Sequence, residues 1–143
     1  MNGREMKLEI KNQIESVATV VSSFEAFASK HRISTRIRRE LCIVVDEVLN
    51  NVIRHAFAQD DQVQLIQISL KAGASGITLT VSDEGQPFNP LDRPQPQTDL
   101  TLDEREIGGL GIHIVRNLMT ESHYERQGAR NVLTLIRKWD SKP

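Results

Sequence analysis

The spacing of apolar residues changes along this chain and predicts where its strands and helices lie. In residues 4–12, apolar side chains alternate with charged ones, which is typical of a short half-buried strand. From there to about Lys30 the spacing becomes three and four residues, which predicts a helix. The apolar face of that helix is Ile14, Val17, Val21, Phe24 and Ala28.

A second, longer helix is predicted over residues 35–57, with residues 31–33 as the connection and Ser34 as the N-cap. Its apolar stripe is Ile37, Leu41, Val44, Val45, Val48 and Val52. At about 100° per residue, Glu47 and Asn51 lie at the margin of this stripe, near the core but not in it. Polar side chains in that position can line the floor of a pocket and still meet a ligand.

The middle of the chain predicts a hairpin followed by a long loop. Residues 65–70 and 77–83 have the spacing of strands, and Gly73 and Gly76 bracket the turn between them. Residues 86–107 carry four prolines and few large apolar side chains. A loop of this length inside a compact domain is uncommon and often functional, and the alternative is a disordered insertion.

The last part of the chain predicts a third helix and two further strands. The helix starts near Gly109, Tyr124 belongs to a short strand, and residues 132–136 form the last strand after a turn at residues 127–130. The apolar face of this helix is Ile112, Val115, Leu118 and Met119.

The resulting order, β-α-α-β-β-loop-α-β-β, predicts an α+β fold. Strands joined in pairs by tight turns favour a mixed, mostly antiparallel sheet, and the three helices would cover one face of it in a two-layer sandwich. A length of 143 residues predicts one domain, residues 1–143.

Composition and charge exclude several classes of function. A net charge of -1 creates no global field that would attract nucleic acid or an anionic membrane. We expect no signal peptide in residues 1–11 and no membrane span, because no apolar run approaches about 20 residues. The single Cys42 excludes an internal disulfide. We expect it to be a buried thiol in a reducing cytoplasm, with a reactive thiol as the alternative.

Glu47 and Asn51 are four residues apart, so their side chains share one helix face. The Asn51 carbonyl oxygen suits a hard cation such as Mg²⁺, which takes few protein ligands beside phosphate oxygens and water. Glu47 could accept a proton from a nucleophile nearby. Taken alone, the pair would more often be two solvated residues.

Asp83, at a strand end, could accept a hydrogen bond from an adenine amino group, although Asp83-Glu84-Gly85 could simply make a turn. The run Gly108-Gly109-Leu110-Gly111 opens a helix, where backbone N–H groups bind phosphate, or else it is a hinge. Neither a P-loop nor a Rossmann fingerprint is present.

Two further features are open to a structural interpretation. His55 falls within the apolar stripe, which favours a partly buried histidine over a catalytic one. Residues 30–39 carry five cationic side chains, which indicate a solvated helix start, a surface for an acidic partner or, more weakly, a nucleic-acid contact.

In combination, four segments resemble the motifs of the gyrase, heat-shock chaperone and histidine-kinase ATPase superfamily. Residues 45–57 (VDEVLNNVIRHAF) resemble its N box, residues 81–88 (VSDEGQPF) its G1 box and residues 108–115 (GGLGIHIV) its G2 box. Residues 131–135 (NVLTL) are similar to its last-strand threonine motif. The short length points within this superfamily to the anti-sigma-factor serine kinases.

The resemblance implies a Bergerat ATP-binding fold in which residues 86–107 form a mobile lid. It implies that Glu47 is the catalytic base and Asn51 the Mg²⁺ ligand. The remaining implied ATP-binding residues are Asp83, Gly85 and Thr134 around adenine, and Gly109, Leu110 and Gly111 at the phosphates. Arg105 would close over the γ-phosphate, or else pair with its acidic neighbours in solvent.

The implied partners are a small anti-anti-sigma-type protein, which is phosphorylated on serine, and a sigma factor. The resemblance leaves homodimer formation open and implies no direct contact with nucleic acid or membrane. Pro87 stands where a glycine is usual, which stiffens the entry to the lid. The alternative function is a nucleotide-sensing interaction module without phosphotransfer, and the presence of Glu47 favours the kinase. A histidine kinase is disfavoured, because no phosphoacceptor helix pair precedes the domain.

Overall fold

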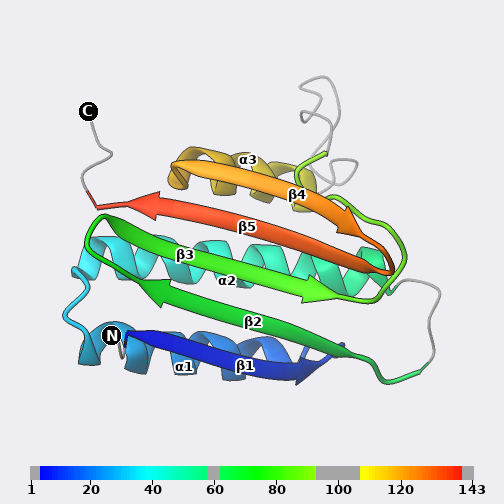
Figure 1. Cartoon of the computed structure of the whole chain (residues 1–143), viewed down its shortest axis with the longest axis horizontal. Coiled ribbons are helices and arrows are strands. Elements are labelled where there is room, and N and C mark those ends of the chain that lie inside the picture. The colour runs from blue at the N-terminus through cyan, green and yellow to red at the C-terminus, as the bar shows by residue number, and fades with distance from the viewer. Residues whose placement is uncertain (1–3, 58–61, 93–106, 140–143) are drawn as a thin grey trace.

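The described residues of the computed structural model form five strands and three helices in the predicted order (Figure 1). The structure describes residues 4–57, 62–92 and 107–139, except for the side chains of residues 107–110. The elements are β1 (Glu5–Lys11), α1 (Ser16–Lys30), α2 (Thr35–Ala56), β2 (Leu65–Ala72), β3 (Gly76–Asp83), α3 (Ile107–Leu118), β4 (Glu121–Gln127) and β5 (Arg130–Lys138).

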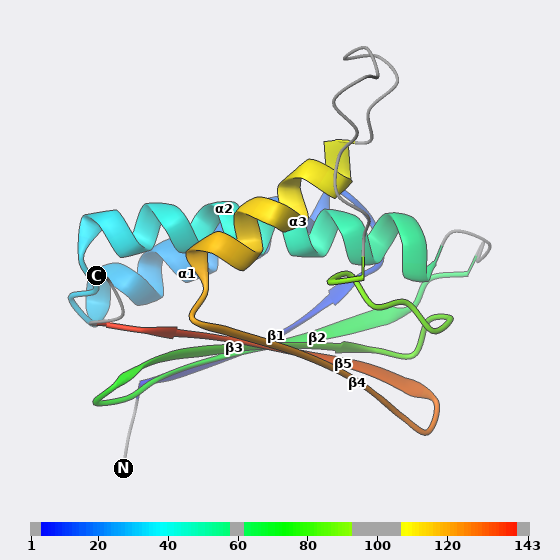
Figure 2. The same cartoon turned by 90° about the horizontal axis from the view of Figure 1, so that it is seen from above.

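The strands form one sheet in the order β1-β2-β3-β5-β4, and every neighbouring pair is antiparallel. Figure 2 shows α1, α2 and α3 together on one side of this sheet. The predicted α+β two-layer sandwich is therefore confirmed, and the sheet is antiparallel throughout its described strands. The chain leaves β3, passes through α3 and enters the edge strand β4, so α3 lies over the β4 end of the sheet (Figure 1).

Burial of the apolar stripe of α2 against the sheet forms the centre of the core. Side chains on alternate positions of β2, β3 and β5 meet this stripe, because successive strand side chains point to opposite faces. The Ser34 hydroxyl accepts a hydrogen bond from the Ile37 backbone N–H at 3.2 Å, which confirms the predicted N-cap. None of the helices in the described ranges is long and apolar enough to cross a bilayer.

One predicted core position is wrong. Ile14 is 46% exposed, because residues 12–15 form the turn between β1 and α1 and the helical spacing begins only at Ser16. The last strand also extends beyond its predicted range, since β5 pairs with the whole length of β3, from Gly76 opposite Lys138 to Asp83 opposite Asn131.

Arg137 is a buried cation that the sequence pattern did not indicate. Its Nη1 donates to Glu40 of α2 at 2.6 Å and to the Leu118 carbonyl oxygen at 3.0 Å. A buried charge is tolerated when it is paired in this way. This contact ties the end of β5 to both α2 and α3.

Candidate functional site

Glu47 and Asn51 face the start of α3 from the middle of α2. The Asn51 side chain is only 2% exposed, and its Nδ2 donates to the Glu47 backbone oxygen at 2.9 Å and to Glu47 Oε2 at 2.8 Å. Both amide hydrogens are therefore directed at Glu47. No described residue donates to Asn51 Oδ1, so this oxygen remains available as a ligand.

Gly111 brings α3 against the Glu47 carboxyl group. A Cβ atom at this position would overlap the carboxyl carbon and both oxygens of Glu47. Only glycine therefore allows α3 to pack here without displacing the carboxylate. Gly109 and Leu110 lie in the first turn of the same helix. The backbone N–H groups of a helix's first turn have no partners within the helix. A phosphate at this end of α3 would lie next to Glu47.

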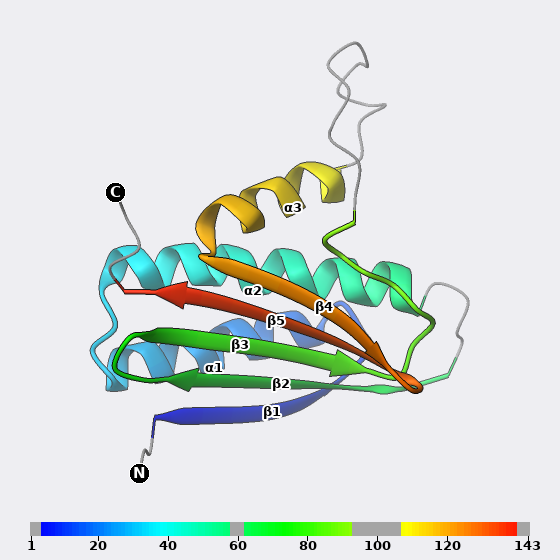
Figure 3. The ribbon, with the colours of Figure 1, turned by 45° about the horizontal axis from the view of Figure 1, so that its top comes forward.

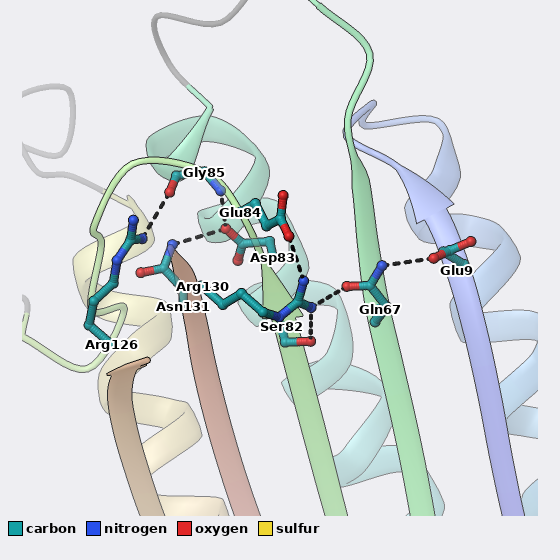
Figure 4. Close-up of polar contacts among 9 residues, drawn as sticks. All are labelled: Glu9, Gln67, Ser82, Asp83, Glu84, Gly85, Arg126, Arg130 and Asn131. Atoms are coloured by element: carbon teal, nitrogen blue, oxygen red, sulfur yellow. Dashed lines mark hydrogen bonds and ion pairs between the residues drawn. The ribbon is translucent and has the colours of Figure 1, made fainter. Parts of the chain in front are cut away.

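Asp83 ends β3 on the face of the sheet that the helices cover, and it is 2% exposed. Its Oδ1 accepts hydrogen bonds from the Gly85 backbone N–H at 2.8 Å and from Asn131 Nδ2 at 2.9 Å (Figure 4). No described residue donates to Oδ2. One carboxylate oxygen is thus held in place, while the other is available to a donor such as an amino group.

Burial raises the pKa of the Asp83 carboxyl group above its ordinary value. The hydrogen bonds from Asn131 and Gly85, and the positive charges of Arg126 and Arg130, act in the opposite direction and lower this pKa. The carboxylate is therefore costly to keep ionised in the absence of a ligand that donates to it.

Asn131, and not Thr134, is the last-strand residue that supports Asp83. Asn131 lies directly opposite Asp83 in the β3–β5 register, whereas Thr134 is opposite Thr80. An odd number of positions separates Thr134 from Asn131, so its side chain points to the other face of the sheet. The prediction that Thr134 supports Asp83 is corrected accordingly.

Asn131 is itself held in one orientation by its neighbours. Its Oδ1 accepts hydrogen bonds from the Tyr124 hydroxyl and from the Phe88 backbone N–H, while its Nδ2 also donates to the Gln86 carbonyl oxygen at 2.9 Å. These donors fix the amide so that Nδ2 points at Asp83. Sequence reasoning assigned no role to Asn131 or Tyr124, because the contact of Asn131 with Asp83 depends on the long-range β3–β5 register.

The turn after β3 is docked onto the C-terminal end of α2. The Gln86 backbone N–H donates to the Ala56 carbonyl oxygen at 2.9 Å, and a Cβ on Gly85 would lie 2.6 Å from that same oxygen. Glycine at position 85 therefore permits this close approach. The Gly85 carbonyl oxygen accepts a hydrogen bond from Arg126 Nη1 at 2.9 Å (Figure 4). These contacts fix the position of Asp83 relative to Glu47 and Asn51 on α2.

The first part of the predicted lid is packed against the protein. After β3 the chain passes the end of α2 and runs toward α3 (Figure 3). Leu91 is buried, and its carbonyl oxygen accepts a hydrogen bond from Arg116 of α3. Phe88 stacks on His55 with ring centroids 5.0 Å apart, so His55 is a partly buried, packed histidine as predicted. Residues 93–106, including Arg105, lie outside the described residues.

Cys42 is half-buried rather than fully buried. Its Sγ donates to Glu25 Oε2 at 3.8 Å, which crosses from α2 to α1. Burial, and then the adjacent Glu25 carboxylate, raise the pKa of this thiol. A raised pKa disfavours the nucleophilic thiolate, which argues against the reactive alternative.

The site has donors and acceptors that fit Mg²⁺ and ATP. Asn51 Oδ1 is a neutral oxygen to which none of the described residues donates, and such an oxygen suits a hard cation. Asp83 Oδ2 is a buried acceptor that suits an adenine amino group. The α3 start packs through Gly111 against Glu47, one helical turn before Asn51 on α2, and it suits the phosphates.

Comparison with known proteins agrees with this geometry. Residues 10–137 match the family model described as the histidine kinase-like ATPase domain. The chain is 28% identical over 135 residues to the serine/threonine-protein kinase BtrW of Bordetella bronchiseptica, covering 94% of each protein. It is 27% identical to the serine-protein kinase RsbW of Bacillus subtilis, covering 84% of this chain and 77% of that protein.

A solved structure has the same fold. The crystal structure of the RsbU and RsbW domains of Rv1364c from Mycobacterium tuberculosis superposes with a TM-score of 0.64 at 15% identity. The match covers 93% of this chain and 32% of that longer one, so the likeness concerns one part of it. Because a family model matches most of its length, the chain belongs to the histidine kinase-like ATPase domain family.

Proposed function

We propose that this protein is an ATP-dependent protein serine kinase that phosphorylates a small protein partner of the anti-anti-sigma type. The observation that carries the proposal is the Glu47 carboxylate, which lies beside Asn51 and directly against Gly111 at the start of α3. A carboxylate in this place adjoins both the cation ligand and the phosphate-binding end of a helix. The names of the curated relatives BtrW and RsbW support the same activity.

Each residue has a distinct role in binding ATP. Asp83 Oδ2 accepts a hydrogen bond from the adenine amino group, and Gly85 and Asn131 hold Asp83 in position. The backbone N–H groups of Gly109, Leu110 and Gly111 bind the phosphates at the α3 N-terminus. Asn51 Oδ1 holds Mg²⁺, which neutralises phosphate charge when it is bound.

Glu47 acts as the general base. It accepts the proton of the partner's serine hydroxyl while the serine oxygen forms a bond to the γ-phosphorus of ATP. The bond between that phosphorus and the β–γ bridging oxygen breaks, and ADP leaves with its electron pair. The hydrogen bond from Asn51 Nδ2 leaves Glu47 Oε1 free to take the proton. The products are phosphoserine on the partner and ADP.

We further propose that the partner is exchanged according to nucleotide state, in the cytoplasm where ATP is available. A sigma factor as a second partner and a homodimer as the working assembly are both compatible with this scheme. The alternative is a nucleotide-sensing module that binds ATP without transferring phosphate. Such a module would need Asn51 and Asp83 but would have no use for a carboxylate at position 47.

Phosphotransfer can be tested directly. The protein is incubated with Mg²⁺, ATP labelled at the γ-phosphate and each small candidate partner, and the modified residue is mapped by mass spectrometry. Label on a partner serine supports the kinase. ATP binding without label on any candidate favours the sensing module.

MgATP should stabilise the fold by about 2.7 kcal/mol at 100 times its dissociation constant, because ligand binds only the folded state. Asn51→Ala should abolish this stabilisation or make it independent of Mg²⁺. Thermal melts with ATP, with and without Mg²⁺, measure both effects. Asn50→Ala is the matched control, since Asn50 Nδ2 donates only to the Asp46 carbonyl oxygen on the half-exposed side of α2. A wild-type melt that millimolar MgATP does not move would contradict nucleotide binding.

A further inference from the structure

A cationic cavity lies at the opposite end of α2 from the Asp83 turn. It has a volume of about 420 Å³, and it is lined by the residue before β1, the α1–α2 connection, the start of α2 and the residue after β5. The lining residues are Arg4, Arg32, Ile33, Ser34, Arg36, Ile37 and Trp139. Since α2 has 22 residues at about 1.5 Å each, its two ends are roughly 33 Å apart. The cavity is therefore far from the adenine end of the proposed nucleotide site, and even Glu47 lies ten residues, roughly 15 Å, along α2 from Ile37.

Three arginines give this cavity a positive charge that the described part of the chain leaves largely uncompensated. None of its described lining residues is acidic. No described carboxylate pairs with Arg4 or Arg32, and Arg36 Nε lies 3.5 Å from Glu40, whose other oxygen is engaged at 2.6 Å by Arg137. The N-terminus of α2 adds the positive end of a long helix dipole, with no acidic residue in its first turn.

Arg32 occupies a backbone position that usually favours glycine. Its φ is 57°, and it lies just after the end of α1. The next N–H, that of Ile33, donates back to the Ala28 carbonyl oxygen at 2.9 Å. Glycine is the usual residue at this point of a helix end, because a side chain there is disfavoured. An arginine is thus present at a conformational cost and contributes its guanidinium to the cavity.

Part of the cavity lining is apolar, which bears on the kind of ligand it fits. Ile37 is buried, Ile33 is half-buried, and the Trp139 ring is held by its Nε1–H, which donates to the Gly73 carbonyl oxygen at 3.0 Å. A free phosphate would gain nothing from these surfaces. An acidic side chain with an apolar neighbour would pair with the arginines and also cover these apolar surfaces.

We propose that this cavity, lined by Arg4, Arg32, Arg36 and Trp139, is a docking site for an acidic, partly apolar segment of a partner protein. Of the five cationic side chains in residues 30–39, only Arg32 and Arg36 line the cavity. The site extends the proposed function by adding a contact with a partner at the end of the molecule away from adenine.

Trp139 provides the test, because it is the single tryptophan of the chain and lines the cavity. Its fluorescence is followed while the full chain is titrated with a short peptide in which Asp and Glu flank a leucine. A peptide of the same sequence with Asn and Gln is the neutral comparison. We expect a saturable change of emission with the acidic peptide only.

The combined variant Arg32→Gln and Arg36→Gln should bind the acidic peptide about tenfold more weakly, since individual exposed ion pairs are weak but two are removed. The control carries Arg38→Gln and Arg39→Gln, which removes the same charge from positions at the start of α2 that do not line the cavity. Stabilisation by MgATP should be unchanged in both variants, which separates this proposal from nucleotide binding.

Several outcomes would overturn the proposal. One is an equal loss of affinity in the control variant, which would indicate a diffuse charge effect. Another is that the acidic peptide leaves the Trp139 emission unchanged, whether or not calorimetry detects its binding elsewhere on the protein. Tighter binding of a DNA duplex than of the peptide, with a steep salt dependence, would assign the arginines to nucleic acid instead.

Discussion

Glu47→Gln should lower the rate of phosphotransfer by about 10²–10⁴-fold, which is the usual loss when a general base is removed. The affinity for MgATP should change little. The glutamine side-chain oxygen can still accept the hydrogen bond that Asn51 Nδ2 donates to Glu47 at 2.8 Å, so the cation ligand keeps its orientation. Single-turnover transfer of labelled phosphate, measured beside a nucleotide-binding isotherm, separates the two quantities.

Asp46→Asn is the matched control for this experiment. Asp46 is the adjacent carboxylate on α2 and is exposed, so its loss removes the same charge without touching the site. We expect the control to transfer phosphate at the wild-type rate. Wild-type transfer by Glu47→Gln itself would mean that positioning of the reactants, and not proton removal by Glu47, drives the reaction.

Asp83→Asn should weaken ATP binding by roughly 10- to 100-fold, because a hydrogen bond to a charged acceptor is lost. The new amide oxygen can still accept from the Gly85 N–H and from Asn131, so the turn keeps its shape. The amide nitrogen, however, would present a donor to the adenine amino group, which is also a donor. The preference for ATP over GTP should narrow, since guanine carries an acceptor at that position.

The same variant should not destabilise the nucleotide-free fold. Burial raises the pKa of Asp83 in the folded state, so the folded protein holds this proton more tightly than the unfolded chain. The protonated Asp83 side chain therefore stabilises the fold at low pH. This contribution is lost as the pH rises through the pKa that Asp83 has in the folded protein. Above the folded pKa the ionised carboxylate therefore costs stability, and there Asp83→Asn should have an equal or higher free energy of unfolding than the wild type.

The affinity of the wild type for MgATP should fall as the pH is lowered through the raised pKa of Asp83, because only the ionised carboxylate accepts from adenine. Asp83→Asn serves as the reference, since it shares the titration of the ATP phosphates but lacks this carboxyl group. Glu84→Gln is the matched control, because Glu84 is exposed and pairs with Arg130 at 3.1 Å. Parallel pH profiles for the wild type and Asp83→Asn would contradict a role for Asp83 at adenine.

Features that depend on one element alone could be predicted from the sequence. The helical repeat determines that Glu47 and Asn51 share one helix face, and the structure places their side chains 2.8 Å apart. The repeat predicted both at the margin of the core, but Asn51 is buried. Strand alternation placed Asp83 at the end of a buried face. The order of elements, and with it the α+β sandwich, followed from the same local periodicities.

Features that join distant segments were decided only by the tertiary structure. Asn131 meets Asp83 across 48 positions of sequence because of the β3–β5 register, and a shift by one residue would have turned Asn131 to the other face. Thr134, which the family resemblance placed beside Asp83, lies opposite Thr80 in the same register. Gly111 against Glu47, and three arginines around Trp139, likewise arise from packing between elements. Local periodicity sets which way a side chain points, whereas register and packing decide what it meets.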